Sequence, residues 1–458
     1  MFRQMLLTIA LIVTIGSVSA QEARPWRVGV AKTAITPAEP MWMSGYASRD
    51  KPAQGKVHDL WAKALVLEDA AGKRCVLVSL DLVGIDRVLA DEIAADLKKH
   101  HGFERDQVML SVSHTHCGPV VGRNLLAMYN LDAMELKKVF AYADDLHAKV
   151  VQVVGVAVKD LQPAQITWKN GYTTFATNRR TNKETEVPKM RALGKLNGPV
   201  DHEVPVLCVR APDGKVRAIA FGYACHATVL SFYQWCGDYP GFAQAELEKR
   251  YPGATALFHA GCGADQTPLP RRSVALAEGY GKQLAEAVDQ VVKAPMTPIK
   301  PLLKTTYARI DLPFGVLPTR EKVVQDTMSK NHYIAARAKM LLADFEKAGA
   351  LKKTYPYPVQ TWQLGNDLTW IALGGEVVVD YSVRLKKELG KVWVTGYAND
   401  VMAYIPSLKV LKEGGYEGDS SMIYYGQPCA WGPRVEAMIV EAVHGQVGAG
   451  RRKQTVTP

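Results

Sequence analysis

Apolar segments of strand-like length alternate with segments of helical periodicity along most of this 458-residue chain. The pattern is clearest between residues 74 and 110, where a helix is predicted at 86–99 between two strands at 74–82 and 107–110. A strand, helix, strand unit of this kind places its two strands parallel in one sheet. The alternation therefore predicts an α/β fold with mixed β-sheets flanked by helices.

The rest of the chain continues this pattern. Further strands are predicted at 26–31, 61–68, 165–168, 204–209, 216–223, 254–258, 303–312, 369–373 and 392–395. Further helices are predicted at 132–158, 240–251, 273–292, 320–348 and 433–443. One more helix is predicted after Gly374-Gly375-Glu376, and it ends at Leu389. The strands at 204–209 and 216–223 are joined across Asp213-Gly214, which is typical of a hairpin turn. Residues 175–199 lack periodicity, so we expect an irregular segment there.

Five polar residues share one position, because each lies just past the C-terminal end of a predicted strand. They are His114, His226, Asp265, Glu376 and Tyr404. Open α/β sheets bind their ligands beyond the carboxyl ends of their strands. The shared position therefore indicates a functional site at that edge of a sheet.

The motif His114-Thr115-His116 is the first candidate for metal binding. In extended backbone its two imidazoles point to the same side, and imidazole is the commonest protein ligand for zinc. A catalytic zinc takes about three protein ligands, a set that His114, His226 and Glu376 would supply. Such an ion activates water and polarises a carbonyl, which would give amide or ester hydrolysis without a covalent intermediate. Taken singly, each residue also fits a structural role, as a strand cap, a buried hydrogen-bonded histidine or an acid at a helix start.

Other catalytic mechanisms leave weaker traces in the sequence. The chain has no G-x-S-x-G motif, which argues against a serine enzyme of the α/β-hydrolase type. Cys117 follows His116, but a catalytic thiol needs a partner that is close in space, and adjacency in sequence does not supply one. Gly261-Cys262-Gly263 is too short to be a phosphate-binding loop.

The N-terminus predicts export. Residues 1–20 have the features of a signal peptide, with Arg3 before an apolar segment and Val18-Ser19-Ala20 as a cleavage site. We therefore expect a periplasmic or secreted protein whose zinc hydrolase domain covers residues 21–445, with a candidate sub-boundary at 295–301 and a basic tail at 446–458. No other apolar run is long enough to span a membrane.

The formal net charge of +11 comes from basic residues that are spread along the chain. A solvated basic surface is the favoured interpretation, contact with a membrane surface is the second, and nucleic acid is not an expected partner. Seven cysteines leave at least one free thiol in a monomer, although export permits disulfides. Cys75 and Cys208 lie in apolar strands and are expected to be buried. The sequence does not indicate an oligomeric state.

Several motifs together resemble the neutral/alkaline ceramidase family, in the same order from about Val28 to Trp431. They are Ser113 to Pro119, Asn178-Arg179, Cys225 to Thr228, Gly237-Asp238 with Gly241, Ala264 to Pro268, Gly375-Glu376, Asn399 to Ile405, Tyr416-Glu417-Gly418 and Tyr425-Gly426. The resemblance implies a zinc amidase that hydrolyses the N-acyl amide of ceramide or a related lipid.

The resemblance also implies roles for individual residues. His114, His226, Glu376 and Tyr404 would hold Zn²⁺, while His116 and Arg179 would orient the substrate or stabilise the oxyanion. Because a phenol has a pKa near 10, Tyr404 has the alternative role of a hydrogen-bond donor to the reacting group.

Two departures from the family pattern concern the substrate. The family carries a β-sandwich domain after the catalytic domain, and we expect a catalytic domain without it here. The family motif Gly-Asp-x-Ser-Pro reads Ala264-Asp265-Gln266-Thr267-Pro268, so Asp265 and Thr267 join the catalytic candidates, with Thr267 keeping a hydroxyl. Two alternatives stay open: the same zinc chemistry on a smaller amide, ester or lactone, including one linked to a carbohydrate, and a non-catalytic binding protein of the cell envelope.

Overall fold

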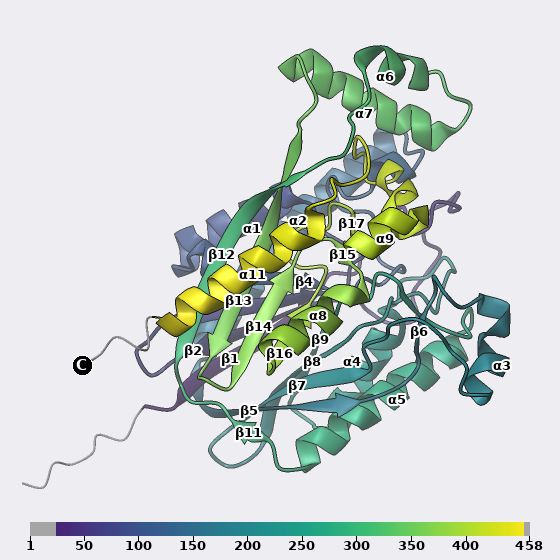
Figure 1. The fold of residues 1–458 in the computed structure, drawn as a ribbon. Coiled ribbons are helices and arrows are strands. Elements are labelled where there is room, and N and C mark those ends of the chain that lie inside the picture. Colours follow the sequence, from purple (N-terminus) through teal and green to yellow (C-terminus); the bar gives the residue numbers. More distant parts are fainter. Residues whose placement is uncertain (1–23, 453–458) are drawn as a thin grey trace, which may run out of the picture.

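Two β-sheets lie face to face in the computed structural model, which describes residues 24–452, and helices cover the outer face of each sheet (Figure 1). The predicted signal peptide lies outside the described residues, as does the end of the basic tail. The order of the four layers is therefore helices, first sheet, second sheet, helices. The prediction of an α/β fold with mixed sheets and flanking helices is confirmed.

The first sheet has the strand order β4-β3-β2-β1-β5-β7-β8-β9, with β11 beside β5. Its strands are β1 (Trp26–Ala34), β2 (Trp61–Glu68), β3 (Arg74–Leu80), β4 (Val108–Val112), β5 (Gln162–Tyr172), β7 (Glu203–Arg210), β8 (Val216–Tyr223), β9 (Thr255–Ala260) and β11 (Thr297–Pro298). Helices α1 (Arg87–His101), α2 (Ala133–Lys159), α4 (Asp238–Arg250) and α5 (Val274–Lys293) cover its outer face. Strands β3 and β4 pair in parallel with α1 between them, and β7 and β8 form the hairpin, as predicted.

The second sheet has the order β12-β13-β14-β16. Its strands are β12 (Leu303–Pro313), β13 (Thr354–Leu364), β14 (Leu368–Leu373) and β16 (Val392–Thr395). Helices α8 (Val379–Leu389) and α11 (Val435–Arg452) cover its outer face. Small elements complete the chain between these layers: β6 (Ala176–Asn178), β10 (Gln266–Pro268), β15 (Glu376–Val377), β17 (Tyr404–Ile405), α3 (Val187–Ala192), α9 (Leu408–Glu413), α10 (Gly415–Gly418) and the 3₁₀ turns Arg105–Gln107, Leu126–Met128, Glu184–Glu186 and Ser420–Ile423.

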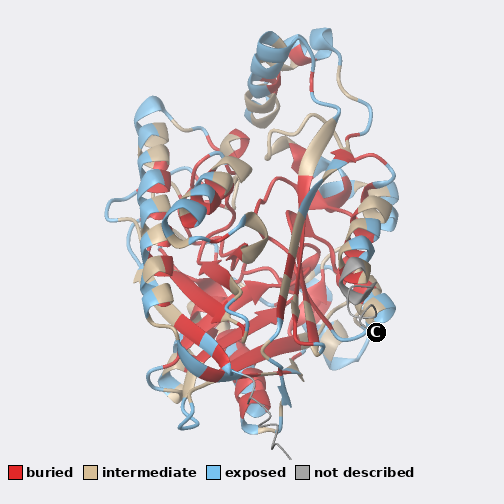
Figure 2. Cartoon of the chain, turned by 90° about the vertical axis from the view of Figure 1, so that its left-hand side faces the viewer, coloured by how far each residue is buried: buried red, intermediate tan, exposed pale blue. Residues whose placement is uncertain are grey.

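The interface between the two sheets is an aromatic core that is closed to solvent (Figure 2). Trp370 and Trp393, from neighbouring strands of the second sheet, stack with ring centroids 3.8 Å apart. Trp362 packs edge-on against Trp370. Aromatic side chains of this size contribute large buried areas, so this interface is a main source of cohesion between the sheets.

His259 lies in this aromatic core, where its ring packs edge-on against both Trp370 and Trp393. It is fully buried, and neither ring nitrogen has a hydrogen-bond partner among the described residues. Burial lowers the pKa of His259 to about 3. The imidazole is therefore neutral in the folded protein at pH values where an unfolded chain already binds a proton.

We expect this histidine to make the fold acid-sensitive. Because its unfolded pKa is about 6.5, the unfolded state binds one more proton between that pH and pH 3, and the unfolding free energy falls by about 1.4 kcal/mol per unit of acidification. Chemical denaturation of the wild type and His259→Leu at several pH values measures this slope. The variant should lose that part of the pH dependence, and identical slopes would contradict the expectation.

Two predicted segments differ from the structure. The expected long helix at 320–348 is two helices, α6 (Arg320–Asp326) and α7 (His332–Ala348), because the Asn331 side chain accepts hydrogen bonds from Tyr333 N and Ile334 N and starts a new helix. The segment 175–199, expected to be irregular, contains β6 and α3. At 295–301, strand β11 pairs with β5, and the last helix, α11, runs on to Arg452.

Helices α6 and α7 project from the top of the molecule in the view of Figure 1. The hairpin carries exposed apolar side chains, with Met328 77% and Met340 40% exposed. Its contact with the body includes a hydrogen bond from the Tyr333 hydroxyl to Ala47 O at 2.8 Å.

The seven cysteines all carry free thiols, and Cys75 and Cys208 are buried as predicted. Among the described helices, none combines the length and the apolar character that a membrane span requires.

Candidate metal centre

His114 reaches the centre through a turn and not through an extended strand. Strand β4 ends at Val112, and His114 has a φ of 59°. The expectation that His114 and His116 face the same way because the backbone is extended is therefore wrong. The left-handed turn, unusual for a non-glycine residue, directs the His114 ring inward, where its Nε2 lies 3.1 Å from His116 Nε2.

The rings of His114 and His226 are oriented by backbone carbonyls. His114 Nδ1 lies 2.6 Å from Val83 O, and His226 Nδ1 lies 2.7 Å from Gly263 O. A carbonyl only accepts hydrogen bonds, so each Nδ1 carries the proton and each Nε2 keeps a lone pair. This arrangement is typical of metal-binding histidines, whose second nitrogen is fixed by an outer hydrogen bond.

Glu376 and Tyr404 come from the far side of the centre, where β15 and β17 pair in parallel with Glu376 opposite Tyr404. The Glu376 Oε2 atom lies 3.1 Å from His114 Nε2 and 3.0 Å from His226 Nε2. The Tyr404 hydroxyl lies 3.3 Å from His226 Nε2. The four residues proposed as metal ligands thus lie around one point.

The donor atoms suit a cation. Burial lowers the pKa of His226 to about 4 and lowers that of His116 well below its usual value, so both rings are neutral at pH 7. His114, His116 and His226 are buried, and their donor nitrogens lie within 4.8 Å of one another. Neutral imidazole lone pairs and a carboxylate that face each other without protons between them fit a metal ion. Burial also raises the pKa of Tyr404, which keeps its proton in the absence of a cation.

His116 is held against a tight loop. Its ring lies 4.8 Å from the Tyr46 ring, and Gly45, with a φ of 101°, has its Cα directly beside the imidazole. A Cβ on residue 45 would overlap the His116 ring. The aromatic loop around Met43 and Tyr46 therefore fixes the position of His116.

We expect Gly45→Ala to reduce activity by roughly 100-fold, the loss typical when a side chain that orients the substrate, here His116, is displaced by about 1 Å. Gly72→Ala is the matched control, because Gly72 also has a positive φ of 81° but no atom within 4 Å of its added Cβ. Both variants share the backbone strain of roughly 1–2 kcal/mol. Activity should fall only in the Gly45 variant, and equal losses in both would contradict this role.

Arg179 lies beside the centre on the loop that follows β6. Its Nη2 donates to the Tyr404 hydroxyl at 3.1 Å, and its Nε donates to Glu417 Oε1 at 2.8 Å. Glu417, which is 5% exposed, also pairs with Arg180. The Arg179 guanidinium is thus fixed between Tyr404 on one side and Glu417 on the other.

The other two catalytic candidates lie in the framework next to Arg179. Asp265 accepts hydrogen bonds from Val379 N at 2.9 Å and from Asn178 Nδ2 at 3.0 Å. Its carboxylate therefore ties α8 to β6 and positions the loops of Glu376 and Arg179. Thr267 lies on β10, which pairs with β6, and its buried Oγ1 has no hydrogen-bond partner among the described residues.

Two tyrosines at the centre had no role in the sequence prediction. The Tyr425 hydroxyl donates to Glu376 Oε1, and the Tyr397 ring lies 4.4 Å from the His114 ring. Tyr425 belongs to a motif that was recognised in the sequence and Tyr397 does not, and phenols have no characteristic spacing that would mark them as partners of a glutamate or a histidine. Cys117 makes a long contact of 3.9 Å to Leu230 O, and burial raises its thiol pKa, which argues against a thiolate nucleophile.

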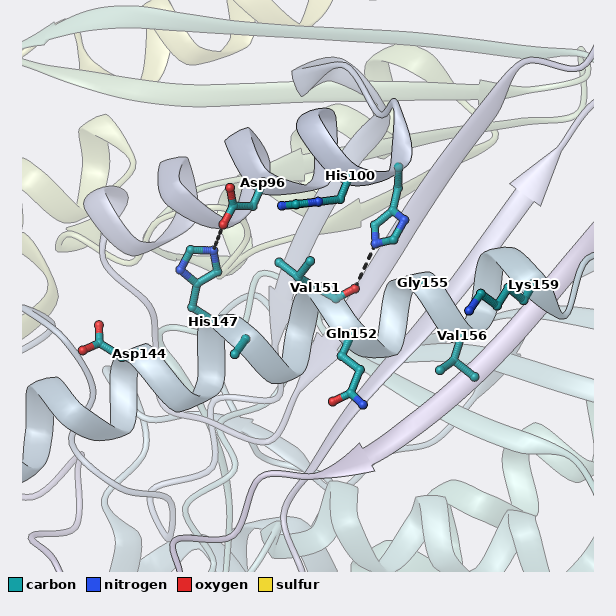
Figure 3. A pocket seen from close by; sticks show the side chains of 11 residues that line it. Asp96, His100, Asp144, His147, Val151, Gln152, Gly155, Val156 and Lys159 are labelled. Atoms are coloured by element: carbon teal, nitrogen blue, oxygen red, sulfur yellow. Dashed lines mark hydrogen bonds and ion pairs between the residues drawn. The ribbon is translucent and has the colours of Figure 1, made fainter.

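Two hollows of similar size differ in their relation to the centre. One, of about 600 Å³, is lined by Arg179, Thr267 and Tyr416 among others and lies directly beside the centre. The other, of about 620 Å³, lies between α1 and α2, where His147 contacts Asp96 at 3.0 Å (Figure 3). None of the predicted site residues lines the second hollow, so only the first belongs to the centre.

Comparison with known proteins gives a consistent result. The family model for the N-terminal domain of neutral/alkaline non-lysosomal ceramidases matches residues 26–268. The neutral ceramidase of Pseudomonas aeruginosa is 31% identical over 212 residues, which cover 45% of this chain and 31% of that protein. Neutral ceramidase 1 of Arabidopsis thaliana is 27% identical over 307 residues, which cover 65% of this chain and 38% of that protein. The matched residues thus span about a third of the length of these relatives.

Two solved structures share the fold. One is a ceramidase complexed with C2, with a TM-score of 0.73 and 20% identity, covering 94% of this chain and 76% of that one. The other is the neutral ceramidase from Pseudomonas aeruginosa, with a TM-score of 0.72 and 21% identity over 94% of this chain and 75% of that one.

Proposed function

Because the chain belongs to the neutral/alkaline non-lysosomal ceramidase family, we propose that it is a zinc-dependent amidohydrolase that cleaves the N-acyl amide of ceramide or of a related lipid. The observation that carries the proposal is the convergence of the His114 and His226 Nε2 atoms on Glu376 Oε2, at 3.1 and 3.0 Å. The same residues in a purely structural network would leave buried lone pairs facing each other, which is costly.

The donor set favours zinc, which binds nitrogen and oxygen ligands in sites of this size. His114, His226 and Glu376 would hold the ion, and Tyr404 would complete its surroundings. A bound zinc ion supplies an activated water at neutral pH and polarises the carbonyl under attack. His116 Nε2, 3.1 Å from His114 Nε2, lies close enough to orient the substrate amide.

Arg179 and Tyr404 stabilise the negative charge of the oxyanion that forms during hydrolysis. The Tyr404 hydroxyl receives a hydrogen bond from Arg179, which polarises its own O–H towards the centre. Donors that are fixed before the reaction stabilise an oxyanion without the cost of reorientation. Asp265 acts as a positioning residue, because it holds the segments that carry Arg179 and Glu376.

We also propose that the protein is exported and acts at a lipid surface. The signal-peptide pattern at residues 1–20 supports export, and the exposed apolar side chains of the α6–α7 hairpin support contact with a membrane surface. The second candidate function is the same hydrolysis on a smaller, more polar amide, ester or lactone. The charged lining of the hollow beside Arg179 favours that alternative.

A matched panel of substrates tests the proposal. N-acylsphingosines of long and short acyl length are compared with short N-acyl and O-acyl compounds, using the zinc-loaded wild type and His114→Ala as control. Release of fatty acid from N-acylsphingosine by the wild type alone would support the ceramide proposal. Cleavage of the polar compounds alone would favour the second candidate, and a wild type that neither binds zinc nor hydrolyses any compound would overturn both.

A further inference from the structure

The hollow of about 600 Å³ beside Arg179 has the size of a small-molecule site. Three segments enclose it: the loop after β6, the end of β10, and the turn between α9 and α10. Arg179 and Tyr416 line it, and the Arg179 guanidinium lies 5.7 Å from the Tyr416 ring centroid. Since Arg179 also touches Tyr404, a group bound in this hollow lies next to the metal centre.

The charges in the lining are already paired with each other. Arg180 bonds to Glu413 and Glu417, and Arg271 bonds to Glu184 with its closest contact at 2.7 Å. Only Lys183 is largely solvated, with 83% of its side chain exposed. The lining holds four basic side chains and three carboxylates, so a phosphate or another anion would meet the carboxylates too and would have to break these ion pairs. An aliphatic chain would strip water from the charges without replacing its hydrogen bonds.

A neutral group with several hydroxyls fits this lining better. Each hydroxyl donates one hydrogen bond and accepts two, so it can bond to a carboxylate and a guanidinium of the same ion pair. Thr267 lines the hollow, and its buried Oγ1 lacks a partner among the described residues. An unpaired buried hydroxyl is unfavourable, and a bound hydroxyl group would supply the missing partner. The 40% exposed Tyr416 ring offers a flat apolar face to the carbon side of a sugar ring.

We propose that this hollow binds a neutral polyhydroxylated headgroup, such as a single sugar ring, which the substrate carries beside its scissile amide. This inference rests on the proposed hydrolase function and narrows its substrate to glycosylated N-acyl compounds. The headgroup lies against Glu413 and Arg271, and the acyl amide passes Arg179 and Tyr416 to reach the centre.

The chain offers two matched control pairs for a test. Glu413 and Lys409 both lie on α9, but only Glu413 lines the hollow. Arg271 and Arg272 both pair with Glu184, but only Arg271 lines it. Glu413→Ala and Arg271→Ala are therefore the test variants, with Lys409→Ala and Arg272→Ala as controls.

Hydrolysis of one N-acylsphingosine is measured with and without a neutral hexose on its headgroup. We expect the wild type to have at least about tenfold higher kcat/KM for the glycosylated compound, a difference of 1.4 kcal/mol. The test variants should lose this preference through KM, and the controls should keep it. A preference for the compound without the sugar, or equal losses in tests and controls, would overturn the inference.

Binding without turnover separates this inference from the proposed function. Saturation-transfer NMR with methyl hexoside, and with inorganic phosphate as the competing anion, is recorded on the zinc-loaded wild type and on Glu413→Ala. Hexoside binding that is lost in the variant supports the headgroup site even if no amide in the panel is hydrolysed. Binding of phosphate in place of the hexoside, or no binding of the hexoside, overturns it.

Discussion

Replacing His226 by alanine is expected to abolish hydrolysis, with a loss of at least about 1,000-fold or about 4 kcal/mol of transition-state stabilisation. His226 Nε2 lies 3.0 Å from Glu376 Oε2, and its Nδ1 is fixed by Gly263 O. Without this imidazole the centre loses one of its donors, while Glu376 and His114 lose a shared partner. The zinc content should fall from about one ion per chain to almost none, since a catalytic site needs about three protein ligands.

Metal analysis and activity on the same preparation measure this result. His147→Ala is the matched control, because His147 is a histidine bonded to an acid, Asp96, but it lies between α1 and α2 (Figure 3). The control should keep both zinc and activity. Treatment of the wild type with a chelator gives a second readout that does not depend on folding of a variant. Full activity in a zinc-free preparation would contradict the metal centre.

Replacing Arg179 by methionine is expected to lower kcat by about 100- to 1,000-fold, the usual effect of removing one oxyanion donor. The zinc content should stay near that of the wild type, because Arg179 reaches the centre only through Tyr404 at 3.1 Å. Arg179→Lys should restore little activity. A lysine offers a point charge, whereas the planar guanidinium here bonds to Glu417 and Tyr404 at the same time.

Steady-state kinetics of these variants separate the roles. A loss confined to kcat indicates an interaction made in the transition state, whereas a loss confined to KM would indicate substrate binding alone. Arg384→Met is the control, because Arg384 lies on α8, the helix that follows Glu376, and pairs outward with Glu388 and Glu436. Its kinetics should match the wild type. Unchanged kcat in Arg179→Met would exclude the proposed role.

Local periodicity was enough to predict the strands and helices of the first sheet apart from β11, which lies in the segment 295–301 that was expected to be a boundary. The parallel pair β3 and β4 with α1 between them follows from apolar spacing and short connections, which are local properties of the sequence. The stacking of two sheets could not be predicted in this way. Strands such as β2 and β14 are apolar on both faces, and a continuous apolar run does not reveal which layer lies on either side.

The candidate site, like the fold, could be predicted from the sequence only in part. Residue type and position after a strand were enough to bring His114, His226 and Glu376 together. The path of the backbone could not be predicted, because the positive φ of His114 depends on tertiary contacts and leaves no sequence signal. Tyr425 was missed as the partner of Glu376 for a related reason, since the two lie far apart in the sequence and meet only in the folded protein.

The division of the donors between the two sheets bears on how the protein acquires its metal. His114 and His226 follow strands of the first sheet, whereas Glu376 follows β14 of the second. The segment matched by the family model, residues 26–268, contains both histidines but not the glutamate. A nascent chain therefore has no complete binding site until its second half has been made and docked. An ion that needs all of these donors would be captured at the end of folding, and the free metal supply of the compartment where folding finishes would select which ion the site carries.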